Sequence, residues 1–106
     1  MNISNNLKEK LKIYKENNHN DIDIEVNHKD KSLSIALDTF ALSIKSLTND
    51  VIKFFNDRNL ECSNTNKSIN KHPILYLEGN HFTLHMRFTG GVYSGAYQYV
   101  LLKLIS

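Results

Sequence analysis

Residues 73–88 read PILYLEGNHFTLHMRF, and this stretch predicts a β-hairpin. Leu75 and Leu77 alternate with other residues before the turn, and after it the alternating apolar residues are Phe82, Leu84, Met86 and Phe88. Gly79-Asn80 provides a two-residue turn made of types that tolerate positive φ. Folding there pairs Leu77 with Phe82 and Leu75 with Leu84, so the large apolar side chains share one face.

An earlier stretch predicts another hairpin. Ile22, Ile24 and Val26 alternate with polar residues, and so do Leu33, Ile35 and Leu37. Folding the chain about residues 28–31 pairs Val26 with Leu33, Ile24 with Ile35 and Ile22 with Leu37. A long helix is the competing interpretation, because the residues from Leu33 to Ile44 also fit a 3.6-residue period. The hairpin is preferred because its register closes without further assumptions.

Helical periodicity appears in three places. Ile3, Leu7, Leu11 and Tyr14 predict a helix over residues 3–17. A second helix is expected from Asp38 or Thr39, with Asp38 as N-cap and a buried stripe made of Phe40, Ala41, Ile44, Leu47, Val51, Ile52 and Phe55. If that helix begins at residues 48–50 instead, residues 40–44 can form a strand. Residues 92–104 are expected to be helical, with a strand as the alternative.

These elements predict the α+β class. The expected order is helix, β-hairpin, helix, β-hairpin and helix, in a single domain over residues 1–106. The antiparallel sheet carries its helices packed on one face. Residues 60–62 are expected to form a short edge strand, and the polar residues 63–71 are expected to form a loop. An exposed sheet edge would allow a homodimer.

Length and composition limit the classes of protein to which this chain can belong. The chain has 106 residues, a formal net charge of +2 and one cysteine. A single thiol forms no internal disulfide, and neither a signal peptide nor an apolar segment of membrane-spanning length is present, so a cytoplasmic location without membrane association is expected. No cofactor motif is found, and no cofactor is expected to bind.

The candidate binding site is the outer face of the second hairpin. With Ile74, it carries Tyr76, Glu78, His81, Thr83, His85 and Arg87. The predicted register sets Glu78 opposite His81 and Tyr76 opposite Thr83. Tyrosine and arginine are enriched where binding energy concentrates. The first hairpin is acidic on its outer face, through Asp21, Asp23 and Glu25, so the chain is divided in charge.

Catalytic and metal motifs are weak. His81-Phe82-Thr83-Leu84 resembles the His-x-Thr-hydrophobic motif of the two-histidine phosphoesterases. Those enzymes need two such motifs, and no other histidine here has Ser or Thr two residues later. His81 and His85 lie about 13 Å apart on a strand, too far to share one metal ion. No catalytic residue and no metal ligand is therefore expected.

The sequence favours a non-enzymatic protein-binding module. We expect a small inhibitor of a larger protein, such as a toxin-neutralising immunity protein or a phage anti-defence protein. The alternatives are an RNA- or DNA-binding domain, for which helix 3–17 offers lysines and the hairpin offers Arg87, and a secretion-chaperone-like binding protein.

Overall fold

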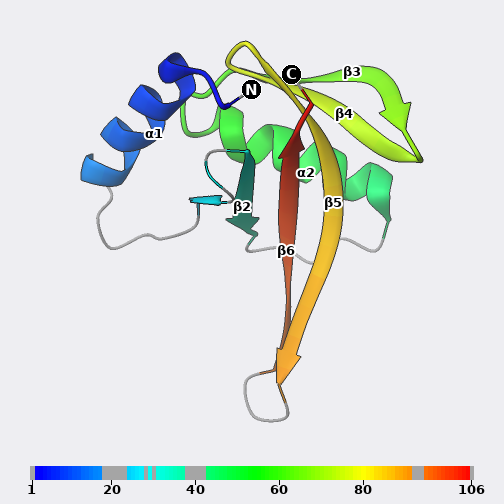
Figure 1. Ribbon diagram of the computed structural model, residues 1–106. Helices are drawn as coiled ribbons and strands as arrows, with labels where there is room; N and C mark the ends of the chain where they lie inside the picture. The colour runs from blue at the N-terminus through cyan, green and yellow to red at the C-terminus, as the bar shows by residue number, and fades with distance from the viewer. Residues whose placement is uncertain are drawn as a thin grey trace.

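The computed structural model describes residues 2–17, 24–27, 29, 31–37, 43–91 and 95–105, with the backbone alone at 27, 88–91 and 95–98. In chain order the elements are α1 (Asn5–Asn17), β1 (Ile24–Asn27), β2 (Ser32–Ala36), α2 (Ile44–Asn56), β3 (Cys62–Ile69), β4 (His72–Leu77), β5 (Asn80–Gly91) and β6 (Gly95–Leu104) (Figure 1). The α+β class is confirmed. No helix in the described part of the chain is long and apolar enough to cross a membrane.

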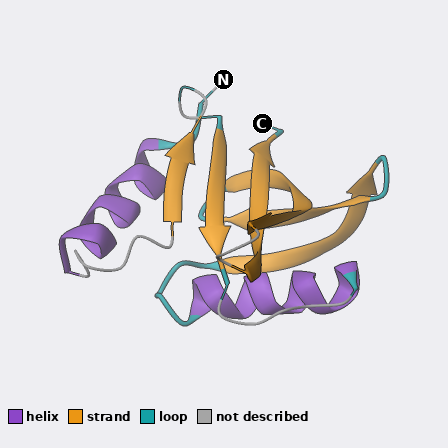
Figure 2. Cartoon of the chain, turned by 90° about the horizontal axis from the view of Figure 1, so that it is seen from below, coloured by secondary structure: helices purple, strands orange, loops and turns teal. Residues whose placement is uncertain are grey.

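The strands form one antiparallel sheet in the order β1-β2-β6-β5-β4-β3. The last strand in sequence, β6, lies between β2 and β5, and α2 carries the chain from β2 to the opposite edge at β3. Figure 2 shows α2 lying across one side of the strongly curved sheet, with α1 at the end near β1 and β2. In Figure 1, β5 and β6 continue as a two-stranded arm beyond the other strands.

The register of the first hairpin is confirmed where it is described. Ile24 pairs with Ile35 and Val26 pairs with Leu33. The third expected pair, Ile22 with Leu37, involves a residue outside the described part of the chain. The alternating pattern succeeds because a slip of one residue would turn Ile24 and Ile35 away from the core.

The register of the second hairpin is shifted by two residues from the prediction. Leu75 pairs with Phe82, Tyr76 with His81 and Leu77 with Asn80, so Glu78 and Gly79 form the turn. Both turn residues have positive φ, 46° at Glu78 and 86° at Gly79, as a type I′ turn requires. Because the shift is even, the side chains within the two strands keep their predicted faces, and the prediction that Phe82 and Leu84 point inward is confirmed. Glu78, predicted on the outer face, is instead a buried turn residue.

Two predicted elements are wrong. Residues 63–71 are not a loop, since β3 extends from Cys62 to Ile69 and pairs with β4 across a two-residue turn. The segment expected to be a C-terminal helix is the strand β6, whose buried residues Val100 and Leu102 are two apart. The element order therefore ends in four consecutive strands.

The start of α2 also differs. The helix begins at Ile44, with Ser43 as N-cap in extended conformation and its hydroxyl accepting a hydrogen bond from the Ser46 N–H. The expected cap Asp38 and the residues Phe40 and Ala41 lie outside the described part of the chain. Within the helix, Leu47, Val51 and Phe55 are buried as expected, whereas Ile44 is 38% exposed in the first turn.

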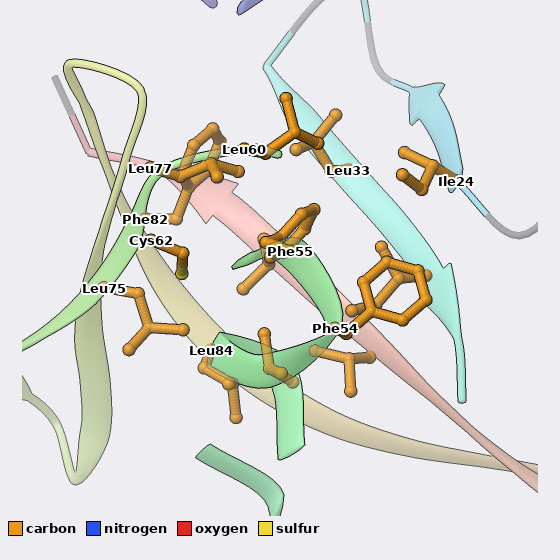
Figure 3. Close-up of a cluster of buried hydrophobic side chains, with 14 of the residues drawn as sticks. Ile24, Leu33, Phe54, Phe55, Leu60, Cys62, Leu75, Leu77, Phe82 and Leu84 are labelled. Atoms are coloured by element: carbon orange, nitrogen blue, oxygen red, sulfur yellow. The ribbon is translucent and has the colours of Figure 1, made fainter. Parts of the chain in front are cut away.

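The core lies between the helices and one face of the sheet. Phe55 is at its centre, with Leu33 on one side and Cys62 on the other (Figure 3). Helix α1 contributes Leu7 and Leu11, and Ile3 just before the helix is buried as well, all three nearly inaccessible to solvent. Burial raises the pKa of the Cys62 thiol to about 12, so this side chain behaves as a small apolar residue.

Candidate functional site

The candidate site is the sheet face opposite the core, here called the outer face. Strand alternation and the pairing register place the following described side chains on it: Glu25, Ser32, Ser34, Ala36, Ser63, Lys67, Ile69, His72, Ile74, Tyr76, His81, Thr83, His85, Arg87, Tyr99, Leu101 and Lys103. Both helices send their apolar stripes to the other side of the sheet. The strands therefore hold these groups on a rigid platform.

Charge on the outer face is uneven. Lys67, Arg87 and Lys103 are exposed cations on β3, β5 and β6. Among the strand residues whose side chains the structure describes, Glu25 on β1 is the one carboxylate on this face. The β3–β6 half is consequently cationic even when its histidines are neutral, and it suits anionic groups on a partner.

A histidine pair lies at the centre of the cationic half. The ring centroids of His72 and His85 are 3.9 Å apart, and His85 Nε2 lies 2.9 Å from the Thr83 hydroxyl. His85 is only 9% exposed. Burial, together with the positive charges of His72, Lys103 and Arg87, lowers the pKa of His85 to about 4. At neutral pH this imidazole is uncharged and serves as part of the platform rather than as an exposed donor.

Aromatic and apolar groups border the cations. Tyr76 is half-buried and meets the exposed His81 edge-on, with ring centroids 5.8 Å apart. Beside this pair is a hollow of about 360 Å³, lined by Thr65, Lys67, Ile74, His81 and Ile105. A half-buried tyrosine next to a hollow with one lysine can hold an acidic or amphipathic side chain of a partner.

Glu78 is placed differently from the other candidate residues. It is 7% exposed, and its carboxylate accepts hydrogen bonds from Lys10 Nζ at 2.8 and 3.0 Å, from the Glu61 N–H at 2.7 Å and from Asn6 Nδ2 at 3.3 Å. Next to it, the Asn80 side chain joins the turn to both the N–H and the hydroxyl of Ser4. Glu78 thus fastens α1 to the β4–β5 turn, and the structure commits its carboxylate to contacts within the protein.

This network sets the ionisation of Glu78. Burial alone would raise the pKa of the carboxyl, but the hydrogen bonds from Lys10, Glu61 and Asn6 and the charge of Lys10 outweigh it, and the pKa is lowered. The ionised form is favoured in the folded protein, and the same hydrogen bonds hold this non-glycine residue at positive φ in the turn.

The acidic hairpin shares a face with the cationic half. Glu25 is exposed on β1 and lies opposite Ser34, on the same face as Leu101 and His85 in the next strands. Asp21 and Asp23 lie outside the described part of the chain. The two hairpins therefore do not present separate surfaces; they form the two ends of one continuous outer face.

The outer-face side chains missed from the sequence include Lys67, His72, Tyr99 and Lys103. Lys67 was missed because residues 63–71 were assigned to a loop, and Tyr99 and Lys103 because residues 92–104 were assigned to a helix. His72 precedes the stretch from which the second hairpin was predicted. The alternation of Val100, Leu102 and Leu104 with Tyr99, Leu101 and Lys103 carries the signal for a strand. Each apolar run there also fits a helix, so the pattern alone did not decide.

The described residues form no cluster that could bind a metal ion. Among the residues that the structure describes, no three His, Cys, Asp or Glu side chains converge on a common point. The cations Lys103 and Arg87 act on His85 of the His72–His85 pair, and their positive charge disfavours a divalent cation there.

Comparison with known proteins leaves the outer face as the basis for a functional assignment. No protein-family model, no curated protein and no solved structure shows significant similarity to this chain.

Proposed function

We propose that the protein is a non-enzymatic binding module that recognises an acidic region of a larger protein through the outer face, and that it inhibits this partner as an immunity or anti-defence protein does. One observation carries the proposal: the β3–β6 half of that face presents the exposed cations Lys67, Arg87 and Lys103 on the same face as the half-buried Tyr76. Tyrosine and arginine on a rigid surface are the groups that most often dominate binding energy.

The charge pattern supports a protein partner. A protein surface that matches this face needs acidic groups opposite β3–β6 and a basic or neutral group opposite Glu25. Such a two-signed pattern fixes the orientation of a partner, whereas a uniform polyanion would meet repulsion at the β1 end.

The test is capture of the partner from the native host, identified by mass spectrometry. Arg87→Ala and Tyr76→Ala should each weaken capture at least tenfold while the melting temperature stays within a few degrees of wild type. Lys12→Ala and Lys53→Ala, at exposed lysines on α1 and α2, are matched controls and should capture normally. Equal capture by all four variants would exclude the outer face.

A single-stranded nucleic acid is the second candidate. The Tyr76–His81 ring pair beside Lys67 and Lys103 resembles the combination of stacking groups and cations that single strands require. Titration with single-stranded RNA at several salt concentrations separates the two candidates. Phosphate contacts give an affinity that falls steeply with salt, and loss of binding on Tyr76→Ala would favour stacking.

A further inference from the structure

The outermost strands of the sheet are both protected against pairing with another chain. β3 has a register shift between Asn64 and Lys67, positive φ of 62° at Asn66, and an exposed lysine at residue 67. β1 has four residues and carries the exposed Glu25. Bulges, charges and short length are the usual devices that keep sheet edges from recruiting strands.

A third edge lacks these devices. The β4–β5 ladder runs only as far as the pair Ile74 and Thr83, whereas the β5–β6 ladder continues to Gly91 and Gly95 without a register shift. Leu84 and His85 still have Pro73 and His72 of β4 beside them, and the ring centroids of His72 and His85 are 3.9 Å apart. From Met86 to Gly91, β5 has β6 on one side and no described strand on the other. We call this stretch the open edge.

The backbone geometry shows which groups the open edge presents. The Ile105 N–H donates to the His81 carbonyl at 2.9 Å, so the N–H and C=O of His81 face β6. In an antiparallel strand this direction alternates, so odd-numbered residues of β5 bond to β6 and even-numbered residues point away from it. Leu84 would meet Pro73, which has no N–H to donate, and this explains why the β4 ladder stops there.

The outward-pointing groups beyond this point belong to Met86, Phe88 and Gly90. The stretch from Met86 to Gly91 contains a single charge, Arg87, and no proline. A two-stranded ribbon is marginally stable in water without a third strand or a covering helix. Both facts favour occupation of the open edge by another strand.

Building on the proposed function, we propose that the open edge receives an extended segment of the partner, acidic on the side of the outer face and apolar on the other side. On the outer face the new strand lies beside Arg87, an exposed cation of the cationic half. On the opposite face it lies beside Met86, which is partly buried and packs against the core. A second copy of this chain is a poorer occupant, because antiparallel self-pairing brings two copies of Arg87 onto one face.

Amide hydrogen exchange followed by NMR tests this pairing. The probe is a short, terminally blocked peptide that alternates Glu with Val, and the same peptide with Lys in place of Glu is its control. At millimolar Glu-Val peptide the exchange of three amides should slow at least tenfold: Met86, Phe88 and Gly90. The amides that already face β6 are internal controls and should change less: Arg87, Thr89 and Gly91.

A chemical variant of the probe sharpens the result. N-methylation of the Glu-Val peptide at every second residue blocks one hydrogen-bonding edge, so one of the two methylation patterns should abolish protection and the other should retain it. Protection with this edge dependence supports the proposal. Protection that appears without peptide as protein concentration rises indicates self-pairing and overturns it.

The outcome is separable from that of the proposed function. If the peptide shifts the resonances of Arg87 and Tyr76 but leaves the even-numbered amides unprotected, the outer face binds anions and the open edge is not used. If neither peptide alters shifts or exchange at millimolar concentration, the pairing is overturned, and partner capture by the Arg87 and Tyr76 variants still decides the function.

Discussion

His85 illustrates how a residue type that looks like a binding group becomes part of the structure. Its ring faces His72, its Nε2 lies beside Thr83, and two cations lie close enough to lower its pKa. Burial on an outer sheet face is unusual for an imidazole, and here it follows from the large neighbours on adjacent strands. The uncharged His85 thus forms part of the support for the exposed side chains of the outer face.

The pKa of His85 predicts a loss of stability in mild acid. The folded-state pKa of about 4 lies below the ordinary value of 6.5, so the unfolded chain binds more protons between these values. The free energy of unfolding should therefore fall as the pH decreases from about 6.5 to about 4, by at most about 3 kcal/mol from this residue. Urea denaturation at several pH values measures the change. His85→Gln should flatten the dependence, whereas His81→Gln, at an exposed position, should retain it; equal slopes for all three proteins would contradict the assignment.

Lys10 and Glu78 make a prediction about the attachment of α1. Lys10→Ala leaves the buried carboxylate of Glu78 with the Glu61 N–H and Asn6, and should lower the free energy of unfolding by about 1–2 kcal/mol, since the lysine itself is partly exposed. Lys12→Ala, on the same helix, is the control and should change it by less than about 0.5 kcal/mol. Because the pKa of Glu78 is lower in the folded protein than in the unfolded chain, the carboxylate stabilises the fold at any pH above the unfolded-state pKa. This stabilisation is lost as the pH falls through the folded-state pKa. Thermal unfolding that is identical for both variants would show that the ion pair contributes nothing.

At the scale of elements, the first hairpin was predictable and β3 was not. Alternation of large apolar residues fixes the pairing of Ile24 with Ile35, because one face is buried. In β3, residues 63–68 are polar, and every residue from 63 to 69 is partly or fully exposed, so there is no buried face to produce a pattern. The strand exists because β4 and two consecutive residues at positive φ, Asn70 and Lys71, hold it at the edge.

The two-residue error in the second hairpin has a local cause. Gly79-Asn80 was the expected turn, yet Asn80 is in the strand and Glu78 takes the first turn position. Glutamate is rarely chosen for positive φ, and only the contacts with Lys10, Asn6 and Glu61 make it favourable. These partners are distant in sequence, so no local pattern reveals them. The strand side chains predicted for the outer face lie on it nevertheless, because a register shift of two residues leaves each side chain on the same face.

The cap of α2 gives a prediction at this scale. Ser43→Ala removes the hydroxyl that accepts from the Ser46 N–H at 3.1 Å and should destabilise the protein by about 1 kcal/mol. Ser46→Ala removes an exposed hydroxyl within the first turn and should cost less than about 0.5 kcal/mol. Chemical denaturation of both variants compares the two positions, and a larger loss for the Ser46 variant would mean that the helix begins elsewhere.

For the whole molecule, the dominant feature is the central place of β6. Leu102 pairs with Leu33 in β2 and with Leu84 in β5, so the first hairpin joins the sheet only through the last strand. Pairing of residues so distant in sequence slows folding, because loop-closure entropy is lost before the contacts form. Continuity of the outer face from Glu25 to Lys67 depends on the same pairing.

The rate at which the buried Cys62 thiol is modified should report how often the core opens. A thiol-specific reagent needs the thiolate, and a buried thiol with a pKa of about 12 supplies almost none at pH 8. Alkylation should therefore proceed only through opened molecules, at a rate set by how often the region around Phe55 separates from β3. Sub-denaturing urea should accelerate the modification in proportion to global unfolding, and Cys62→Ser should abolish it. Modification of the native protein as fast as that of the unfolded chain would mean that this thiol is accessible to reagent without unfolding.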